Sequence, residues 1–133
     1  MNATAPEGEP CLCGSGTGYL ECCGPLHLGE RAAETALALM RSRFTAFALG
    51  DESYLLSTWH PRTRPRGVDL DRDVAWRRLQ IVDTEGGARD DSSGVVEFRA
   101  QYVRHGKRHI MQERSRFTKE KDRWLYVDGD LTS

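Results

Sequence analysis

The 133-residue sequence lacks several features that would assign it to a familiar class. No cysteine lies outside one short N-terminal stretch, and no apolar run approaches the roughly 20 residues that a membrane-spanning helix requires. The formal net charge is −1, without the basic excess that is typical of a nucleic-acid-binding domain. We therefore expect neither a membrane span nor a nucleic-acid partner.

The first ten residues also lack a targeting signature. They contain neither a basic segment nor an apolar core, so no signal peptide is visible, and we expect a protein of the reducing cytoplasm. Their richness in Ala, Pro, Gly and Glu predicts a disordered tail over residues 1–10. No serine or cysteine nucleophile motif is present in the chain, so no catalytic residue can be named and an enzyme is not the favoured interpretation.

The four cysteines form the motif with the clearest chemistry. Cys11, Cys13, Cys22 and Cys23 follow the pattern C-x-C-x8-C-C, with the segment Gly14-Ser15-Gly16 between the two pairs. Four thiolates this close together can enclose one tetrahedral Zn²⁺ ion. Glycine supplies the positive φ angles that so short a loop needs. The sequence therefore predicts one structural zinc ion with four cysteine ligands.

Two disulfides and four free thiols are the alternatives to zinc. A bond between adjacent Cys22 and Cys23 would be strained, because their Cα atoms lie only about 3.8 Å apart and disulfides usually span about 4.4–6.8 Å. Free thiols would not require a Gly-Ser-Gly loop. The adjacent pair is also unusual for zinc, since two or more residues commonly separate such ligands. His27 is therefore an alternative ligand in place of one member of that pair.

From Cys11 to Gly24 the sequence resembles the SEC-C motif, a small zinc-binding element found at the C-terminus of the SecA translocation ATPase and in many other bacterial proteins. The match includes Gly14-Ser15-Gly16 and Tyr19, whereas the last ligand is His in SecA and Cys23 here. In SecA the motif engages the chaperone SecB and the ribosome. The resemblance therefore implies that this segment docks a protein partner, which is the leading functional hypothesis.

Helical signals dominate the first half of the remaining chain. Apolar residues recur at steps of three, four and three between positions 37 and 47, which predicts a helix over residues 33–49 that Gly50 ends. Asp51 is a plausible N-cap of a second helix that runs through Trp59 and ends before Pro61. Asp69 or Asp71 would cap a third, short helix. The residues of the apolar stripe are Leu37, Met40, Phe44 and Phe47, and those of the third helix include Val74, Ala75 and Trp76.

The second half of the chain reads as strands. Apolar and polar residues alternate through residues 95–105, and turn signals separate this segment from its neighbours. The expected strands are residues 79–85, 95–105, 108–118 and 123–128. Helices followed by an antiparallel sheet predict an α+β fold.

Three segments, Leu39–Phe47, Thr58–Pro61 and Trp124–Gly129, resemble the YchJ-like family of uncharacterised bacterial proteins. That family joins an N-terminal SEC-C motif to an NTF2-like domain, a cone of helices packed on a curved antiparallel sheet. The resemblance implies a tail at residues 1–10, a zinc motif at 11–28 and an NTF2-like domain at 29–133.

The resemblance also implies a pocket in the cone. A His–carboxylate pair could perform acid–base chemistry there, and Arg43 could bind a carboxylate or phosphate. The alternative function is therefore a small-molecule-binding or enzymatic domain. In the competing structural interpretation, Arg43 and Glu113 form a buried ion pair and the aromatic side chains belong to the core. The pocket candidates are Arg43, Trp59, His60, Glu113, Trp124 and Asp128.

Overall fold

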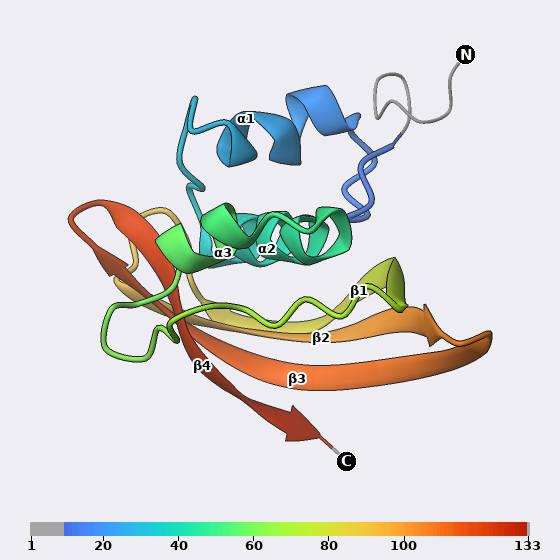
Figure 1. The fold of residues 1–133 in the computed structure, drawn as a ribbon. Coiled ribbons are helices and arrows are strands. Elements are labelled where there is room, and N and C mark those ends of the chain that lie inside the picture. The colour runs from blue at the N-terminus through green and yellow to red at the C-terminus, as the bar shows by residue number, and fades with distance from the viewer. Residues whose placement is uncertain (1–9, 133) are drawn as a thin grey trace.

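Four antiparallel strands form a single sheet in the order β1-β2-β3-β4 in the computed structural model, which describes residues 10–132. Pairing is irregular at two places between β1 and β2 and at one place between β3 and β4. Such bulges bend strands and increase their twist, and the sheet curves beneath the helices in Figure 1. The strands are β1 (Val74–Gly86), β2 (Ser93–Arg104), β3 (Lys107–Glu120) and β4 (Arg123–Thr132).

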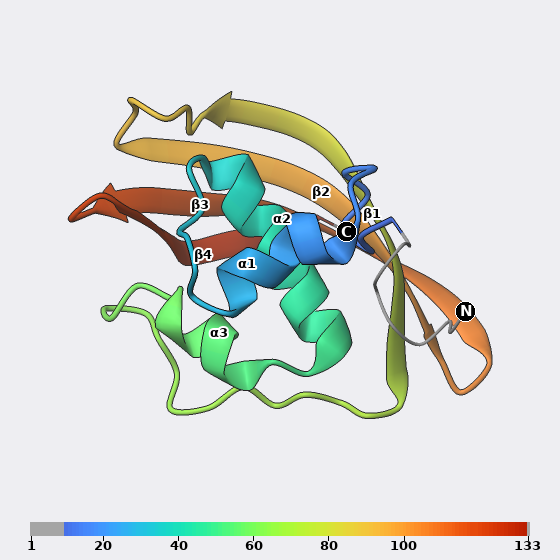
Figure 2. The ribbon, with the colours of Figure 1, turned by 90° about the horizontal axis from the view of Figure 1, so that it is seen from above.

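The helices form two layers above one face of this sheet. Helices α2 (Ala36–Leu49) and α3 (Glu52–Ser57) lie next to the sheet, and α1 (Cys23–His27) crosses over α2 on the side away from the sheet (Figures 1 and 2). A short 3-10 helix, η1 (Tyr19–Glu21), precedes α1. Within residues 10–132, no helix is both long enough and apolar enough to cross a membrane. The predicted α+β fold, with helices packed on a curved antiparallel sheet, is confirmed.

The helix ends follow the local sequence. Thr35 Oγ1 accepts a hydrogen bond of 3.0 Å from the Ala38 N–H at the start of α2, and Gly50 ends that helix in the left-handed region at φ 77°. Asp51 Oδ1 accepts a 3.1 Å bond from the Tyr54 N–H, so the predicted N-cap of α3 is confirmed. The predicted helix over residues 33–49 begins three residues later than expected.

The predicted third helix is wrong. Val74 is the first residue of β1 and pairs with Arg104, and Trp76 pairs with Tyr102. Asp71 closes a turn instead of capping a helix: its Oδ1 accepts from the Asp73 N–H, and its carbonyl accepts from the Val74 N–H. The strand expected at residues 79–85 therefore starts five residues earlier.

The core lies between α2 and the concave face of the sheet. Met40 and Phe44 are buried there, and Leu37 and Phe47 pack against the same cluster while remaining partly accessible. The opposite side of α2 is buried as well, at Ser42 and Thr45, because the N-terminal segment covers it. A helix buried on two sides has no solvent-facing stripe along much of its length.

The N-terminal segment is continuous with this core. Leu26 of α1 belongs to the same apolar cluster as residues of α2. Core packing therefore crosses the predicted boundary between the zinc motif at 11–28 and the domain at 29–133. The predicted tail lies outside the described residues except for Pro10, which pairs with Gly18. Hereafter residues 11–28 are called the knuckle.

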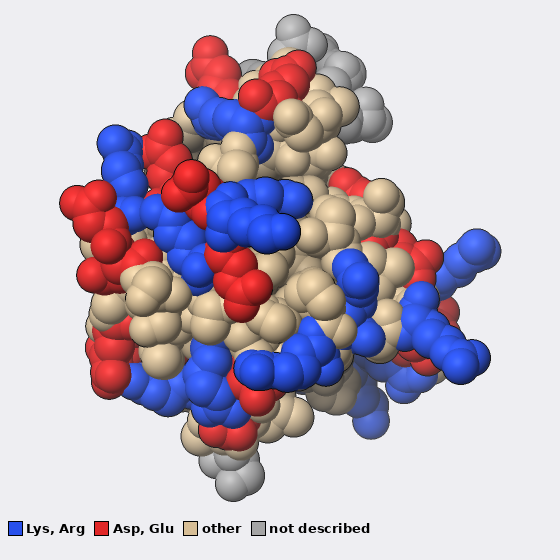
Figure 3. All heavy atoms as spheres, turned by 90° about the vertical axis from the view of Figure 1, so that its left-hand side faces the viewer, with Lys and Arg blue, Asp and Glu red and all other residues tan. Residues whose placement is uncertain are grey.

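The outer face of the sheet is charged. Arg114 donates to Asp83 at 3.0 Å and to Glu97 at 2.9 Å, and Arg116 donates to Asp128 at 2.6 Å. On the solvent side, Arg114 of β3 thus pairs with β2 and, across it, with β1, and Arg116 of β3 pairs with β4. Figure 3 shows a different side of the molecule, the left-hand end in Figure 1, where Lys and Arg side chains are likewise interspersed with Asp and Glu.

Candidate functional site

The four cysteines converge on one point. Their Sγ atoms all lie within 4.8 Å of one another, with 3.6 Å between Cys13 and Cys22 and 3.9 Å between Cys22 and Cys23. A tetrahedron with metal–sulfur bonds of about 2.3 Å has sulfur–sulfur edges of about 3.8 Å. No disulfide joins any of the four, all of which are among the described residues. The cluster therefore has the size of a tetrathiolate metal site and could hold a metal ion.

A tight loop brings the first cysteine pair toward the second. The Cys11 N–H donates to the Thr17 carbonyl at 2.7 Å, and the Gly14 N–H donates to the Cys11 carbonyl at 3.1 Å. Gly14 and Gly16 have φ angles of 86° and 89°, which is the region expected of glycine in so short a turn. The glycines thus perform the role predicted from the sequence.

The adjacent pair reaches the same point because the backbone changes direction between its members. Cys22 has the non-helical angles φ −120° and ψ −97°, whereas Cys23 is the first residue of α1. Their side chains therefore do not diverge as they would within one regular helix or strand. Ser15 Oγ lies 3.1 Å from Cys22 Sγ and adds a polar contact to the more accessible sulfur of the pair.

His27 has a different role from the one considered as an alternative ligand. Its Nε2–H donates to the Ser42 carbonyl at 2.8 Å, and its Nδ1 lies 2.8 Å from the Tyr19 hydroxyl. Its ring also packs edge-on against Tyr54, with 4.7 Å between centroids. Nε2 joins α1 to α2 and Nδ1 joins α1 to η1, so both ring nitrogens are engaged and neither is available to replace a cysteine.

The thiols control one another's ionisation. Hydrogen bonds from Cys11 and Cys23 lower the pKa of Cys13 to about 3, whereas shared hydrogen bonds with Cys11 and Cys13, together with burial, raise the pKa of Cys23. One thiolate is thus favoured, and further negative charge is opposed. A bound cation would remove that opposition, since metal coordination stabilises the deprotonated form of each thiol.

The cluster is anchored to α2 on its buried side. Arg41 Nη1 donates to the Cys13 carbonyl at 2.7 Å, and Cys11 Sγ lies 3.8 Å from Thr45 Oγ1. Cys11, Cys13 and Cys23 are buried. The cysteine loop is therefore attached to α2 through its backbone and through a buried sulfur.

A cavity of about 160 Å³ lies between the sheet and the side of α2 that faces away from the cysteines; it is called the cone cavity below. Three predicted pocket residues, Arg43, Trp59 and Glu113, line it. Arg43 Nη1 donates to the Leu55 carbonyl at 2.8 Å and to Thr58 Oγ1 at 2.7 Å. Within residues 10–132, no ion pair of 4.0 Å or less joins Arg43 to Glu113, so the predicted ion pair between them is not formed.

The Arg43 guanidinium is instead held by aromatic rings. Its central carbon lies 4.9 Å from the Trp59 ring centroid and 4.6 Å from that of Tyr126. Burial lowers the pKa of Arg43 to about 10, which leaves the group protonated at neutral pH. The cavity is thus apolar in most of its wall but holds the Arg43 guanidinium, and the Glu113 side chain lines it as well.

The other three pocket candidates lie elsewhere, which corrects the expectation that His60 and Glu113 share a cavity. His60 Nε2 is 2.6 Å from Glu120 Oε2, near the β3–β4 turn. Asp128 pairs with Arg116 on the outer face of the sheet. Trp124 is buried, and its indole N–H donates to the Glu34 carbonyl at 3.2 Å.

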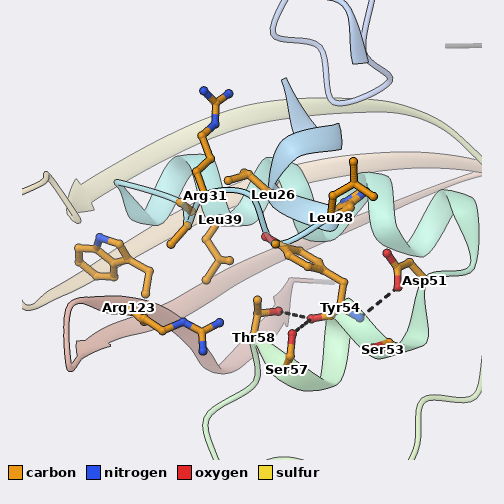
Figure 4. A pocket seen from close by; sticks show the side chains of 15 residues that line it. Leu26, Leu28, Arg31, Leu39, Asp51, Ser53, Tyr54, Ser57, Thr58 and Arg123 are labelled. Carbon is orange, nitrogen blue, oxygen red and sulfur yellow. Dashed lines mark hydrogen bonds between the residues drawn. The ribbon is translucent and has the colours of Figure 1, made fainter. Parts of the chain in front are cut away.

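Trp124 also borders a second hollow, of about 430 Å³, between α1, α3 and the start of β4 (Figure 4). The hydroxyls of Ser57 and Thr58 on its wall donate to the Tyr54 carbonyl at 3.1 and 2.8 Å. These polar groups complete the end of α3, and we assign no chemistry to this hollow.

Sequence reasoning missed two polar residues of the cone cavity. Ser115 Oγ donates to Glu113 Oε2 at 2.9 Å, and the Tyr126 hydroxyl donates to the same oxygen at 3.0 Å. Burial, and then the nearby carboxylate, raise the pKa of Tyr126, which keeps its hydroxyl protonated as a donor. A tyrosine in a strand, such as Tyr126, is readily interpreted as a core residue, and Ser115 gave no signal because a lone serine in a strand is common.

We expect Gly129→Ala to destabilise the protein by about 1–3 kcal/mol. A Cβ at Gly129 would overlap Glu113 Oε2, so the carboxylate would have to leave Ser115 and Tyr126. Urea denaturation of the variant measures the change in the free energy of unfolding.

The control for this prediction is the same substitution in a Glu113→Ala background. Without the carboxylate, Gly129→Ala should lower the free energy of unfolding only slightly, since alanine loses less conformational freedom in a strand than glycine does. An equal loss of stability in both backgrounds would show that the collision with Glu113 is not the cause.

Comparison with known proteins places these features in context. The family described as "YchJ, middle NTF2-like domain" matches residues 35–129. A UPF0225 protein of Streptomyces coelicolor is 52% identical, over 92% of this chain and 95% of its own. The solution structure of a SEC-C motif-containing protein from Rhodopseudomonas palustris superposes with a TM-score of 0.82 at 35% identity, covering 92% of this chain and 98% of that one. A crystal structure of a SEC-C motif-containing protein from Psychrobacter arcticus shares the fold, with a TM-score of 0.74 at 24% identity over 93% of this chain and 82% of that one.

Proposed function

Because the chain belongs to the YchJ-like family, whose curated relatives are UPF0225 proteins, we propose that its knuckle binds one structural zinc ion and that the metal-held knuckle docks a protein partner. The observation that carries the metal assignment is the convergence of four Sγ atoms within 4.8 Å of one another. The SEC-C designation of the Rhodopseudomonas relative agrees with it.

The donor set supports zinc in particular. All four donors are sulfur, the spacing is tetrahedral in size, and soft thiolates at a tetrahedral site favour zinc among common cellular metals. Four thiolates would also leave no open coordination position for water or substrate, which supports a structural role. Because such thiols persist in a reducing compartment, we further propose that the protein is cytoplasmic.

Exposed leucines support the docking role. Leu12, Leu20 and Leu28 of the knuckle are 40%, 54% and 73% exposed, although leucine is usually buried. A loop fixed by metal would present these side chains without ordering them at the moment of binding, which reduces the entropic cost of association. The knuckle therefore combines a rigid frame with apolar contact groups.

Affinity purification with the full chain as bait tests this role. The double variant Leu20→Glu/Leu28→Glu should lose the protein that wild type captures, because each glutamate would be desolvated at the interface. The matched control is Ile110→Glu/Leu131→Glu, whose original side chains are 64% and 71% exposed on the sheet. Retention of the same partner by the knuckle variant, or equal loss in the control, would contradict docking through the knuckle.

A further inference from the structure

The cone cavity lies apart from the metal centre, on the other side of α2. Its wall is largely aromatic and aliphatic, with Phe44 and Phe47 from α2, and Trp76, Phe98 and Met111 from the sheet. Its volume of about 160 Å³ is close to that of an engineered protein cavity of about 150 Å³ that binds benzene. The space therefore fits a ligand with a single ring.

The Arg43 guanidinium at this cavity is only partly paired within the protein. Among residues 10–132, hydrogen bonds from Arg43 come only from Nη1, so Nε and Nη2 remain for another acceptor. Trp59 lines the same cavity, and its buried indole Nε1–H has no hydrogen-bond partner in the described part of the chain. That nitrogen has almost no accessible surface, so the donors open to a ligand in the cavity are those of Arg43.

Glu113 supplies the opposite kind of group. Its Oε2 accepts from Ser115 and Tyr126, as described above, while within the described residues no hydrogen bond reaches Oε1. Because the carboxylate is fixed by two donors, Oε1 is a preorganised acceptor for a ligand N–H or O–H. The cavity thus presents both donors and an acceptor to its contents.

This combination disfavours charged ligands. An anion drawn to Arg43 would also face the Glu113 carboxylate, and a cation drawn to Glu113 would face the Arg43 guanidinium. Either charge would lose its hydration on entering an apolar cavity without a free counter-charge. An uncharged group that both accepts and donates hydrogen bonds meets neither difficulty.

We propose that the cone cavity binds an uncharged, single-ring aromatic molecule bearing one group that accepts from Arg43 and donates to Glu113, such as a carboxamide or a phenolic hydroxyl. The ring lies among the aromatic walls, and the polar group lies beside Arg43 and Glu113. This site does not depend on the proposed docking role, since the two lie on opposite sides of α2.

Titration of the ¹⁵N-labelled full chain with benzamide tests the site by NMR. Each of the three tryptophans gives one indole N–H signal, and Trp59 and Trp76 line the cavity whereas Trp124 does not. We expect the signals of Trp59 and Trp76 to move with a saturable dependence on benzamide, while that of Trp124 stays in place. Unmoved signals of Trp59 and Trp76, or equal movement of all three, would overturn the proposal.

Matched probes and variants test the ligand class. Toluene, benzoate and benzylamine share the ring, and each should bind at least about tenfold more weakly than benzamide, the scale of a hydrogen bond to a charged group. Tighter binding of toluene, benzoate or benzylamine would assign the cavity to apolar, anionic or cationic ligands and contradict the proposal.

Glu113→Gln keeps the shape of the side chain but replaces the carboxylate, and should lower the affinity for benzamide about tenfold. Glu120→Gln, which changes the partner of His60 outside the cavity, should leave the affinity unchanged. Equal affinities of the two variants for benzamide would show that Glu113 does not bind the ligand, which contradicts the proposal. Since toluene makes no polar contact, its weak binding should be the same in both variants, which separates loss of the acceptor from misfolding.

Discussion

Cys23→Ser is expected to weaken zinc binding at least a hundredfold. Changes to outer-shell partners of metal ligands already cost about 10–100-fold in affinity, and Cys23 is a proposed direct ligand whose side chain is buried in the cluster. A hydroxyl is a harder and less readily ionised donor than a thiol, so it replaces the sulfur poorly. Competition with a chromophoric zinc chelator measures the affinity of each variant.

Two variants give this prediction its controls. Cys23→His should retain more affinity than Cys23→Ser, since imidazole is a good zinc ligand and histidine occupies this place in the resembling motif of SecA. Thr17→Ala alters an exposed residue of the same loop and should bind zinc as wild type does. Zinc affinity in Cys23→Ser within a fewfold of wild type would show that Cys23 is not a ligand.

Phe44→Ala is expected to destabilise the protein by about 3–5 kcal/mol. The Phe44 side chain is 3% exposed, and its ring meets Trp76 edge-on with 6.0 Å between centroids. Removing the ring loses its burial and leaves a cavity between α2 and the sheet. Urea denaturation followed by circular dichroism measures the free energy of unfolding.

Leu49→Ala is the matched control on the same helix. Leu49 is 56% exposed at the end of α2, so its truncation should change stability by only about 0.5 kcal/mol. A loss below about 1 kcal/mol for Phe44→Ala would contradict the packing of α2 on the sheet.

The features predicted well were those with a local physical signature. The spacing of Met40 and Phe44 on α2, and the Asp51 cap of α3, need only neighbouring residues to define them. Trp76 lies in β1 and not in the helix that a cap at Asp69 or Asp71 predicts. Its pairing with β2 shifts between Trp76 and Arg78, which breaks the alternation that marks a strand.

Features that depend on distant contacts were less accessible to sequence reasoning. Ser42 and Thr45 are buried because the knuckle covers α2, yet small polar residues give no hydrophobic signal of a second buried face. The sequence analysis places His60 beside Glu113, whereas the structure pairs it with Glu120, seven residues further along β3. At about 3.4 Å per residue, that error corresponds to about 24 Å along the strand. Periodicity assigns a residue to a face of a strand, but only tertiary contacts fix which position another element reaches.

The central claim is that the knuckle is held by one zinc ion with four cysteine ligands. Native mass spectrometry of the full chain, purified under reducing conditions without a metal-affinity tag, tests it most directly. The account predicts one zinc ion per chain, which is lost on acidification as the thiolates gain protons. A metal-free chain that takes up no zinc when the ion is supplied, with all four thiols reduced, would contradict it.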